Sequence, residues 1–203
     1  TLDGWKMIGT MESGQRIAVP RKSLTPSRTY VHDENELILL GHLIGDGSYL
    51  SGQPLRYTTA SEAHSMAVKT AAEDRFGVTV NRHEGKGNWH QLVFSGNGNR
   101  WKPAGMNKWL RDLGIFNQRS HEKHIPSFIF KLSDIQIAFF LKHLWATDGT
   151  LFTLKSKQSR TSTRIVFSTN SPTLANDVSH LLLRLDIFAR IRIATQKAQY
   201  RTL

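Results

Sequence analysis

The sequence predicts an α+β fold made of two pseudo-symmetric halves, each running helix, two strands, helix, two strands, helix (αββαββα). Two observations lead to this prediction. Apolar residues recur at helical spacing in two stretches, 36–47 and 134–149. Both stretches end in the same dipeptide, Asp46-Gly47 and Asp148-Gly149. A unit of this length is too long for a solenoid repeat, so the pattern indicates duplication of a whole half-domain.

The residues around the two stretches match as well. Asp33 and Ser133 precede them as N-caps. After them, Tyr57-Thr58-Thr59-Ala60-Ser61 and Phe167-Ser168-Thr169-Asn170-Ser171 each indicate a strand that leads into an N-cap serine. We therefore expect helices over about 62–75, 105–115 and 172–185, and strands over Val78–Arg82, Trp89–Phe94 and Phe188–Arg192. We expect the second half to be truncated, because Leu203 falls inside its fourth strand.

Composition limits the class of protein. The chain has 203 residues, of which 39% are hydrophobic and 21% charged, and this fits a folded globular protein. Without cysteine, it has no disulfide, thiol nucleophile or zinc–cysteine site. No apolar run approaches the roughly 20 residues that cross a bilayer, and the N-terminus shows no signal peptide.

The charge balance points to a polyanionic partner. Lys and Arg number 27 against 16 Asp and Glu, which gives a net charge of +11. Residues 150–203 alone carry nine basic and two acidic residues, but no low-complexity basic tail is present. A membrane partner would require a basic amphipathic helix, which the sequence lacks. We therefore expect nucleic acid as the partner and no membrane.

Asp46 and Asp148 are the candidate catalytic residues. If the two apolar helices pack lengthwise, with Gly41 and Gly45 allowing close contact, their C-terminal ends bring both carboxylates together. Two neighbouring carboxylates repel unless a cation joins them. Mg²⁺ suits such a pair, because it binds one or two carboxylates with waters and substrate phosphates, and it supports phosphodiester hydrolysis. A single Asp-Gly after a helix would be only a turn, but two in a duplicated frame favour function.

The two motifs resemble a known family. Leu39-Leu40-Gly41-His42-Leu43-Ile44-Gly45-Asp46-Gly47 and Leu141-Lys142-His143-Leu144-Trp145-Ala146-Thr147-Asp148-Gly149 are similar to the paired motifs of LAGLIDADG homing endonucleases, of the kind carried in inteins. The resemblance extends to Trp109–Ile115 and His124-Ile125-Pro126. His143 departs from the small residue that the family prefers, which bears on how tightly the helices meet there.

The resemblance implies a monomeric endonuclease that hydrolyses both strands of a long asymmetric site in double-stranded DNA. Asp46 and Asp148 would be catalytic and would bind Mg²⁺, with Mn²⁺ as a substitute. The peptide carbonyls of Gly45 and Thr147 would be further metal ligands. The four-stranded sheet of each half would lie in the major groove as a saddle. The family often adds a basic residue near the end of the fourth strand. Arg100 and Lys102 are the nearest candidates in the first half, and Lys102 is the one assigned a catalytic role.

Polar and basic side chains on the expected strands are the candidates for DNA contact. Side chains alternate between the faces of a strand, so one face of each sheet can be basic while the other packs under helices. Lys and Arg on that face would contact phosphates, and Arg could also bind guanine. The candidates are Arg56, Thr58, Arg82, Lys86, His90, Arg100, Lys155, Lys157, Arg160, Arg164, Arg190, Arg192 and Lys197.

The first thirty residues hint at a host protein. Thr1–Lys6 and Arg16–Arg21 resemble an intein splicing-domain segment just before an endonuclease insertion, in a pattern similar to inteins of bacterial replicative helicases. An ordinary leader strand and linker is the alternative. We expect the host in cis and a cytoplasmic, nucleoid-associated protein. The expected domains are 1–30, the edge of a splicing domain with its linker, and 31–203, the endonuclease domain, with halves at about 34–118 and 121–203.

Other functions stay open at this stage. A maturase-like or decayed member of the family would bind nucleic acid without cutting it. A transcription regulator with a related sheet, or an inert insertion within an intein, would also lack cleavage. A binder would show salt-dependent affinity and no metal-dependent product.

Overall fold

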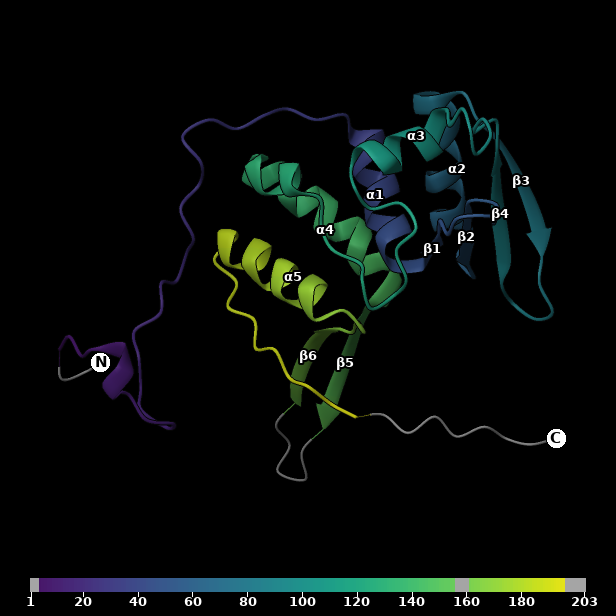
Figure 1. The fold of residues 1–203 in the computed structure, drawn as a ribbon. Coiled ribbons are helices and arrows are strands. Elements are labelled where there is room, and N and C mark those ends of the chain that lie inside the picture. The colour runs from purple at the N-terminus through teal and green to yellow at the C-terminus, as the bar shows by residue number, and fades with distance from the viewer. Residues whose placement is uncertain (1–3, 156–160, 196–203) are drawn as a thin grey trace.

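A computed structural model of the protein describes residues 4–155 and 161–195. Its regular elements confirm the α+β class (Figure 1). The helices are α1 (Glu34–Asp46), α2 (Glu62–Phe76), α3 (Gly105–Asp112), α4 (Asp134–Asp148) and α5 (Pro172–Arg184), with 3₁₀ turns at Ile8–Thr10 and Ser127–Lys131. The strands are β1 (Gly47–Ser48), β2 (Arg56–Thr59), β3 (Thr79–Glu84), β4 (His90–Ser95), β5 (Gly149–Lys155) and β6 (Thr161–Phe167).

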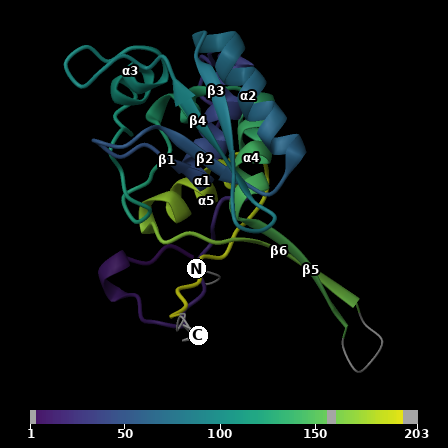
Figure 2. The same cartoon turned by 90° about the vertical axis from the view of Figure 1, so that its right-hand side faces the viewer.

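The first half has the predicted order of elements, from α1 to α3. Its four strands form an antiparallel sheet in the order β1-β2-β4-β3, and α2 lies beside the sheet (Figure 2). The Ser61 hydroxyl accepts the backbone N–H of His64 and so caps α2, as the sequence predicts. Tyr57, Val80 and Leu92 point from the sheet into the core under the helices. Among the described residues, no helix covers the opposite face of this sheet (Figure 2).

Helices α1 and α4 pack against each other at the centre of the molecule (Figure 1). Their predicted N-caps are confirmed, because the side chains of Asp33 and Ser133 accept backbone N–H groups of the first turns. The predicted apolar stripes lie at this interface and in the core around it. The residues of the two stripes with less than a tenth of their surface exposed are Leu37, Leu40, Gly41, Ile44, Ile137, Phe140, Leu141 and Leu144.

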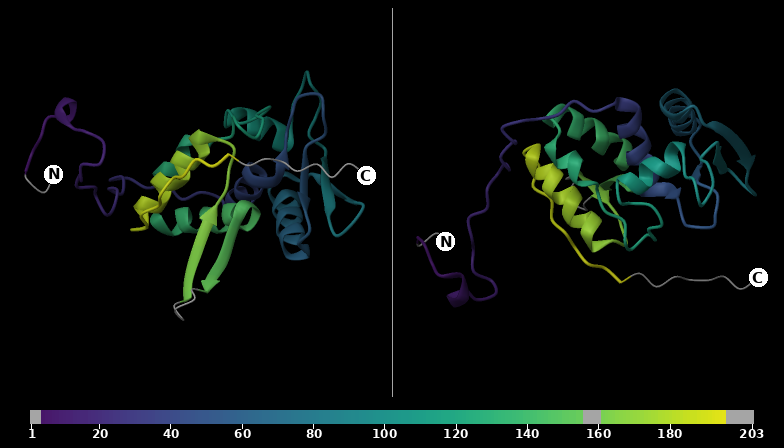
Figure 3. Two further views of the ribbon diagram at one scale, coloured as in Figure 1. Left: turned by 90° about the horizontal axis from the view of Figure 1, so that it is seen from below. Right: turned by 45° about the horizontal axis from the view of Figure 1, so that its top comes forward.

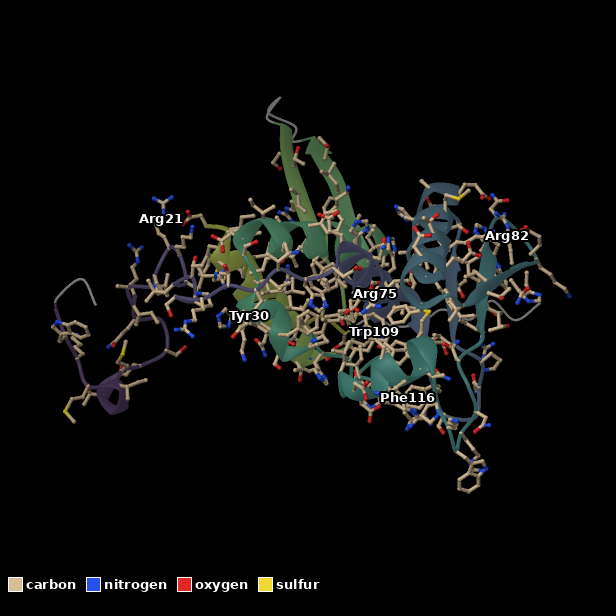
Figure 4. The ribbon with its side chains drawn as sticks, turned by 90° about the horizontal axis from the view of Figure 1, so that it is seen from above. Arg21, Tyr30, Arg75, Arg82, Trp109 and Phe116 are labelled. Carbon is tan, nitrogen blue, oxygen red and sulfur yellow. The ribbon has the colours of Figure 1, made fainter. Side chains whose placement is uncertain are left out.

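Glu36 ties three helices of the first half together from a buried position. Its carboxylate accepts hydrogen bonds from Arg75 of α2 at 2.7 and 2.8 Å and from Trp109 of α3 at 3.0 Å. Figure 4 shows Arg75 and Trp109 next to each other at this point. His32 Nε2 lies 2.7 Å from the same carboxylate. A buried acid needs such partners, and these partners hold α1 in place.

The second half differs from the prediction. After α4, β5 and β6 form a two-stranded antiparallel ribbon that projects from the helical body (Figure 3), and α5 follows. The predicted strand Phe188–Arg192 is wrong, because these residues form no regular structure. The chain leaves α5 through Asp186, whose φ of 63° matches the φ of 60° at Gly77 after α2. In the described part of the chain, however, no strand is in place to pair with Phe188–Arg192, so its backbone forms no ladder.

The N-terminal arm runs along the second half before it enters α1 (Figure 1). Lys22 lies 3.4 Å from Asp134, and the N–H of Ser23 donates to the carbonyl of Leu183. Tyr30 forms a parallel bridge with Leu132. Residues 4–19 extend away from the body, with a short 3₁₀ turn at Ile8–Thr10 and a further turn at Ser13-Gly14. Among the described residues, no helix is long and apolar enough to cross a membrane.

Candidate active site and nucleic-acid surface

The C-terminal ends of α1 and α4 meet at two glycines of α1. A Cβ atom on Gly41 would lie 2.6 Å from the Cβ of His143, and a Cβ on Gly45 would overlap the side chain of Thr147. The helices are therefore in close contact at both points, and His143 is accommodated because a glycine faces it. Asp46 and Asp148 are the last residues of these helices. The geometry thus places both carboxylates at one end of the same interface, as predicted.

Lys123 is the cation of this site, and the sequence analysis missed it. Its ammonium donates to the carbonyl of Gly45 at 2.7 Å and to that of Gly47 at 3.1 Å. Only 8% of Lys123 is exposed. The ammonium lies 5.5 Å from the centre of the Tyr49 ring, in a cation–π arrangement. Lys123 therefore contacts the backbone on both sides of Asp46.

The segment that carries Lys123 is held by α5. The carbonyl of Lys123 accepts a hydrogen bond of 2.6 Å from the Ser171 hydroxyl, at the N-cap of α5. Two residues later, the N–H of Ile125 donates to Asp177 at 2.9 Å. The segment between the two halves is thus held by the second half, and it places Lys123 at the end of α1 that carries Asp46. Lys123 precedes His124-Ile125-Pro126, which the family resemblance already included, so its position in that motif was the available signal.

The charges at this site oppose one another. Burial and the neighbouring Asp148 raise the pKa of Asp46, while Lys123 and His64 act to lower it. Burial also raises the pKa of Asp148, against the effects of Lys123 and of the Thr147 hydroxyl. Burial lowers the pKa of Lys123, although both aspartates favour its charged form. One lysine therefore only partly compensates two partly desolvated carboxylates.

This donor set fits a hard divalent cation. Two carboxylates with raised pKa values are stabilised by a nearby positive charge, and oxygen ligands are those that Mg²⁺ and Mn²⁺ take. Of the predicted carbonyl ligands, that of Gly45 is engaged by Lys123. Thr147 lies directly opposite Gly45. Within the described residues, no group of three or more His, Asp or Glu side chains is arranged to hold a metal. The remaining ligands would therefore come from the two peptide carbonyls, whose oxygens each have two lone pairs, and from water and phosphate.

Two buried histidines lie beside the aspartates at the helix interface. His42 Nδ1 is 2.9 Å from the Tyr57 hydroxyl, and its Nε2 is 3.2 Å from Nδ1 of His143. Burial, together with neighbouring imidazoles or cations, lowers the pKa of His42 to about 3 and that of His143 to about 4. Both are therefore neutral near pH 7 and join the halves by a hydrogen bond. This agrees with the interpretation of His42 and His143 as packing groups rather than metal ligands.

The uncovered face of the first sheet is polar. Cross-strand partners Arg56, Val93 and Asn81 form one row, and Thr58, Gln91 and His83 form the next. Gln91 donates to the Thr58 hydroxyl at 3.0 Å, and Arg56 donates to Gln53 at 2.5 Å. Arg56 and Thr58 were predicted for this face. Asn81, His83 and Gln91 were missed. Amides were not considered as DNA contacts, and of the two histidines on these strands His90 was chosen instead of His83.

Two predicted DNA contacts lie on the other face. His90 is only 2% exposed, packed under the helices, and its Nδ1 is 3.9 Å from Glu62. Arg82 forms a bidentate pair with Glu62 at 2.6 and 2.7 Å and a further contact of 2.6 Å with Glu84. Figure 4 shows Arg82 beside α2 and β3. The prediction that His90 and Arg82 lie on the DNA surface is therefore corrected. The reason is the strand register, since both residues alternate with those that face outward.

The other predicted contacts are scattered. Arg164 lies on β6, and Arg190 and Arg192 lie on the irregular segment after α5, all exposed. Lys86 is in the exposed β3–β4 turn, and Lys155 ends β5. Arg100 and Lys102 are in the exposed loop after β4, where the Arg100 guanidinium lies over the Trp101 ring at 4.8 Å. Lys157, Arg160 and Lys197 lie outside the described residues. The lysine that the fold brings to the aspartate end of α1 is thus Lys123.

Comparison with known proteins agrees with the motifs. Residues 136–203 match the family described as the LAGLIDADG-like domain. The chain is 37% identical over 206 residues to the replicative DNA helicase DnaB of Synechocystis sp., covering 99% of this chain and 23% of that protein. It is 39% identical over 200 residues to DnaB of Rhodothermus marinus, covering 97% and 21%. The chain thus spans less than a quarter of these relatives.

More distant similarity was also found. Protein RecA of Mycobacterium tuberculosis is 23% identical over 204 residues, covering 93% of this chain and 23% of that protein. Among solved structures, that of I-DmoI in complex with DNA and Mn has 15% sequence identity and a TM-score of 0.47, covering 80% of this chain and 83% of that chain. The family resemblance read from the motifs is confirmed by the LAGLIDADG-like match, whose residues 136–203 include the second motif.

Proposed function

We propose that this chain, which carries a LAGLIDADG-like domain, is a site-specific homing endonuclease that hydrolyses both strands of duplex DNA. The observation that carries the proposal is the joining of Asp46 and Asp148 at one end of the α1–α4 interface with Lys123 beside them. The net charge of +11 and the uncovered polar face next to this site suit a DNA duplex.

The chain's own residues would position the scissile phosphate and the attacking water. Asp46 and Asp148 would hold one or more divalent cations, Mg²⁺ or Mn²⁺, with the carbonyls of Gly45 and Thr147 as further ligands. When bound, such a cation activates water and stabilises charge on the phosphate. The Lys123 ammonium would donate to a phosphate oxygen as negative charge develops there. The pairing of His42 with His143 would keep the two carboxylates in fixed relative positions.

We further propose that the chain is the endonuclease part of an intein within a DnaB-type replicative helicase. Its similarity to the DnaB proteins covers nearly all of this chain but less than a quarter of theirs, as an insertion would. Residues 1–30 would then belong to the edge of the splicing domain, with the host in cis and a cytoplasmic location. The target would be a long asymmetric site, bound by one copy of the chain.

The test is cleavage of a supercoiled plasmid that carries an uninterrupted gene for a DnaB-type helicase. The wild-type protein should give a linear product with Mg²⁺ or Mn²⁺ and none with EDTA. Asp46→Asn and Asp148→Asn should each abolish double-strand cleavage and retain DNA binding. Asp74→Asn, which changes an exposed aspartate of α2, is the matched control and should cut normally. Full cleavage by either active-site variant would contradict the proposal. Binding of DNA without cleavage by the wild-type protein would favour a maturase-like or decayed protein.

A further inference from the structure

Equivalent positions next to the two aspartates carry side chains of opposite character. Arg56 of β2 pairs across the sheet with Ser48, two residues after the aspartate of the first half. Val166 of β6 pairs with Thr150, two residues after the aspartate of the second half. Arg56 and Val166 are therefore structural equivalents. One offers a guanidinium and the other only methyl groups.

Val166 and Phe152 form a small apolar patch on the face of the β5–β6 ribbon that corresponds to the uncovered face of the first sheet. Phe167 marks the side that faces the helices at the base of the ribbon, since its ring packs on that of Trp145 with centroids 5.1 Å apart. Further out on that side, Leu151 and Ile165 are each 66% exposed. Side chains alternate along the strand, so Val166 points to the other side. Phe152, which pairs with Arg164, is on the same face as Val166, two cross-strand pairs further from the helices. Phe152 and Val166 are 38% and 36% exposed, respectively.

The surroundings of this patch indicate which kind of partner binds over it. The face continues directly from Asp148, so a duplex held at the aspartates would extend over it. Arg164 is exposed beside Phe152 and supplies positive charge. In the major groove, the apolar group on the base edges is the C5 methyl of thymine, which apolar side chains contact. The polar first sheet instead offers Arg56, Asn81 and Gln91, the residue types that pair with guanine and adenine.

We propose that Val166 and Phe152 read thymine methyl groups, so that the two halves recognise DNA by different chemistry. The inference rests on the proposed function and specifies its substrate. Val166 and Phe152 lie on neighbouring strands and are two ladder positions apart, about 6.8 Å along the ribbon, and base pairs rise about 3.4 Å. The two thymines under Val166 and Phe152 therefore lie about two base-pair steps apart. The half-site under the first sheet is read by hydrogen bonds.

The test begins with selection of tight-binding duplexes from a pool with a random central segment, using the purified chain in EDTA. Each thymine of the selected duplex is then replaced by uracil, which removes only the methyl group. Replacement at the two positions under the ribbon should weaken binding about fourfold each, the effect of one buried methyl group. Replacement elsewhere should leave the affinity unchanged.

Two variants assign the effect to the proposed face. Val166→Gln should abolish the sensitivity to uracil at one position. Ile165→Gln makes the same change one residue earlier, on the opposite face, where Ile165 is 66% exposed, and should retain it. Thermal melting checks that both variants fold. The inference is overturned if the affinity for the selected duplex does not depend on the thymine methyl groups, or if this dependence persists in Val166→Gln. Neither result would contradict DNA binding itself. Failure to select any duplex contradicts the proposed function itself.

Discussion

In the first half, α1 leads into a four-stranded sheet with a polar outer face, whereas in the second half α4 leads into a two-stranded ribbon with an apolar patch. Up to the aspartates, the two halves are alike. Each helix has an N-cap that accepts a backbone N–H and ends in Asp followed by a glycine that begins a strand. The comparison teaches that the helix ends, which must meet, stay alike, while the described strands that follow them carry different side chains at equivalent positions.

Even at the shared interface, the halves contribute unequally. Gly41 and Gly45 come from α1, and the side chains that fill the space, His143 and Thr147, come from α4. Close contact requires a small residue on one side of each contact only. A bulky residue at the position of His143 is therefore compatible with tight packing.

The largest expected effect is on the rate of DNA cleavage and comes from Lys123, a residue that, among those described, has no counterpart in the symmetric plan of the two halves. Lys123 lies in the link between them, and its ammonium donates to the backbone carbonyls on both sides of Asp46. Lys123→Met should lower the rate of DNA cleavage by about 10²–10³, as loss of one charge-stabilising donor does, and leave DNA affinity nearly unchanged. Single-turnover cleavage and gel-shift binding measure the two quantities. Lys69→Met, on the exposed surface of α2, is the control. Equal rates for the two variants would show that Lys123 takes no part in the reaction.

The next largest effect tests the unequal contributions of α1 and α4 to the interface between them. Gly41→Ala places a methyl group against the Cβ of His143 and the backbone N of Leu144, at 2.6 and 2.8 Å. The helices must separate to accept it, so we expect a loss of about 1–3 kcal/mol in the free energy of unfolding, typical of overpacking. Urea denaturation measures this loss. Gly9→Ala adds the same atom where no neighbour lies within 4 Å and should be neutral. A stable Gly41→Ala variant would show that the two helices pack less closely than described.

A smaller effect follows from the aspartate pair. The folded-state pKa values of Asp46 and Asp148 are raised by burial, and that of Asp46 also by its neighbour. A raised carboxyl pKa means that stability is present at low pH and is lost as the pH rises through the folded pKa. With EDTA present, Asp148→Asn should therefore raise the melting temperature at pH 7, and the gain should vanish near pH 3. The same gain from Asp74→Asn would mean that general charge, rather than this pair, is responsible.

Much of the first half could be predicted because its signals are local. The caps at Asp33 and Ser61 and the helical stripe of α1 need only neighbouring residues, and they placed the elements correctly. The strand Phe188–Arg192 has the right residues but, in the described part of the chain, lacks the neighbour that a strand requires. Pairing is not a local property, so the sequence could not reveal this.

The candidate site likewise contains residues that local sequence signals locate and a residue that only distant contacts bring into place. The motifs locate Asp46 and Asp148, because a helix end carries its last residue with it. Lys123 reaches them only through contacts of its own segment with Ser171 and Asp177, about 50 residues further along the chain. Spacing in the sequence does not encode such a contact. The face of each strand residue depends on register, which is why His90 was assigned to the surface and lies in the core.

The smallest expected effect tests this assignment of faces in the first half. Arg82 and Arg56 lie on adjoining rows of one sheet, but Arg82 points to the helix side and is held by Glu62 and Glu84. Arg82→Gln should therefore leave the affinity for a selected duplex unchanged. Arg56→Gln should lower it by about 1–3 kcal/mol if Arg56 binds guanine in a bidentate manner. Titration of labelled duplex compares the two, with melting curves to confirm folding. A loss of affinity in Arg82→Gln equal to that in Arg56→Gln would mean that DNA approaches the helix side of the sheet, and the surface proposed for the first half would have to be reversed.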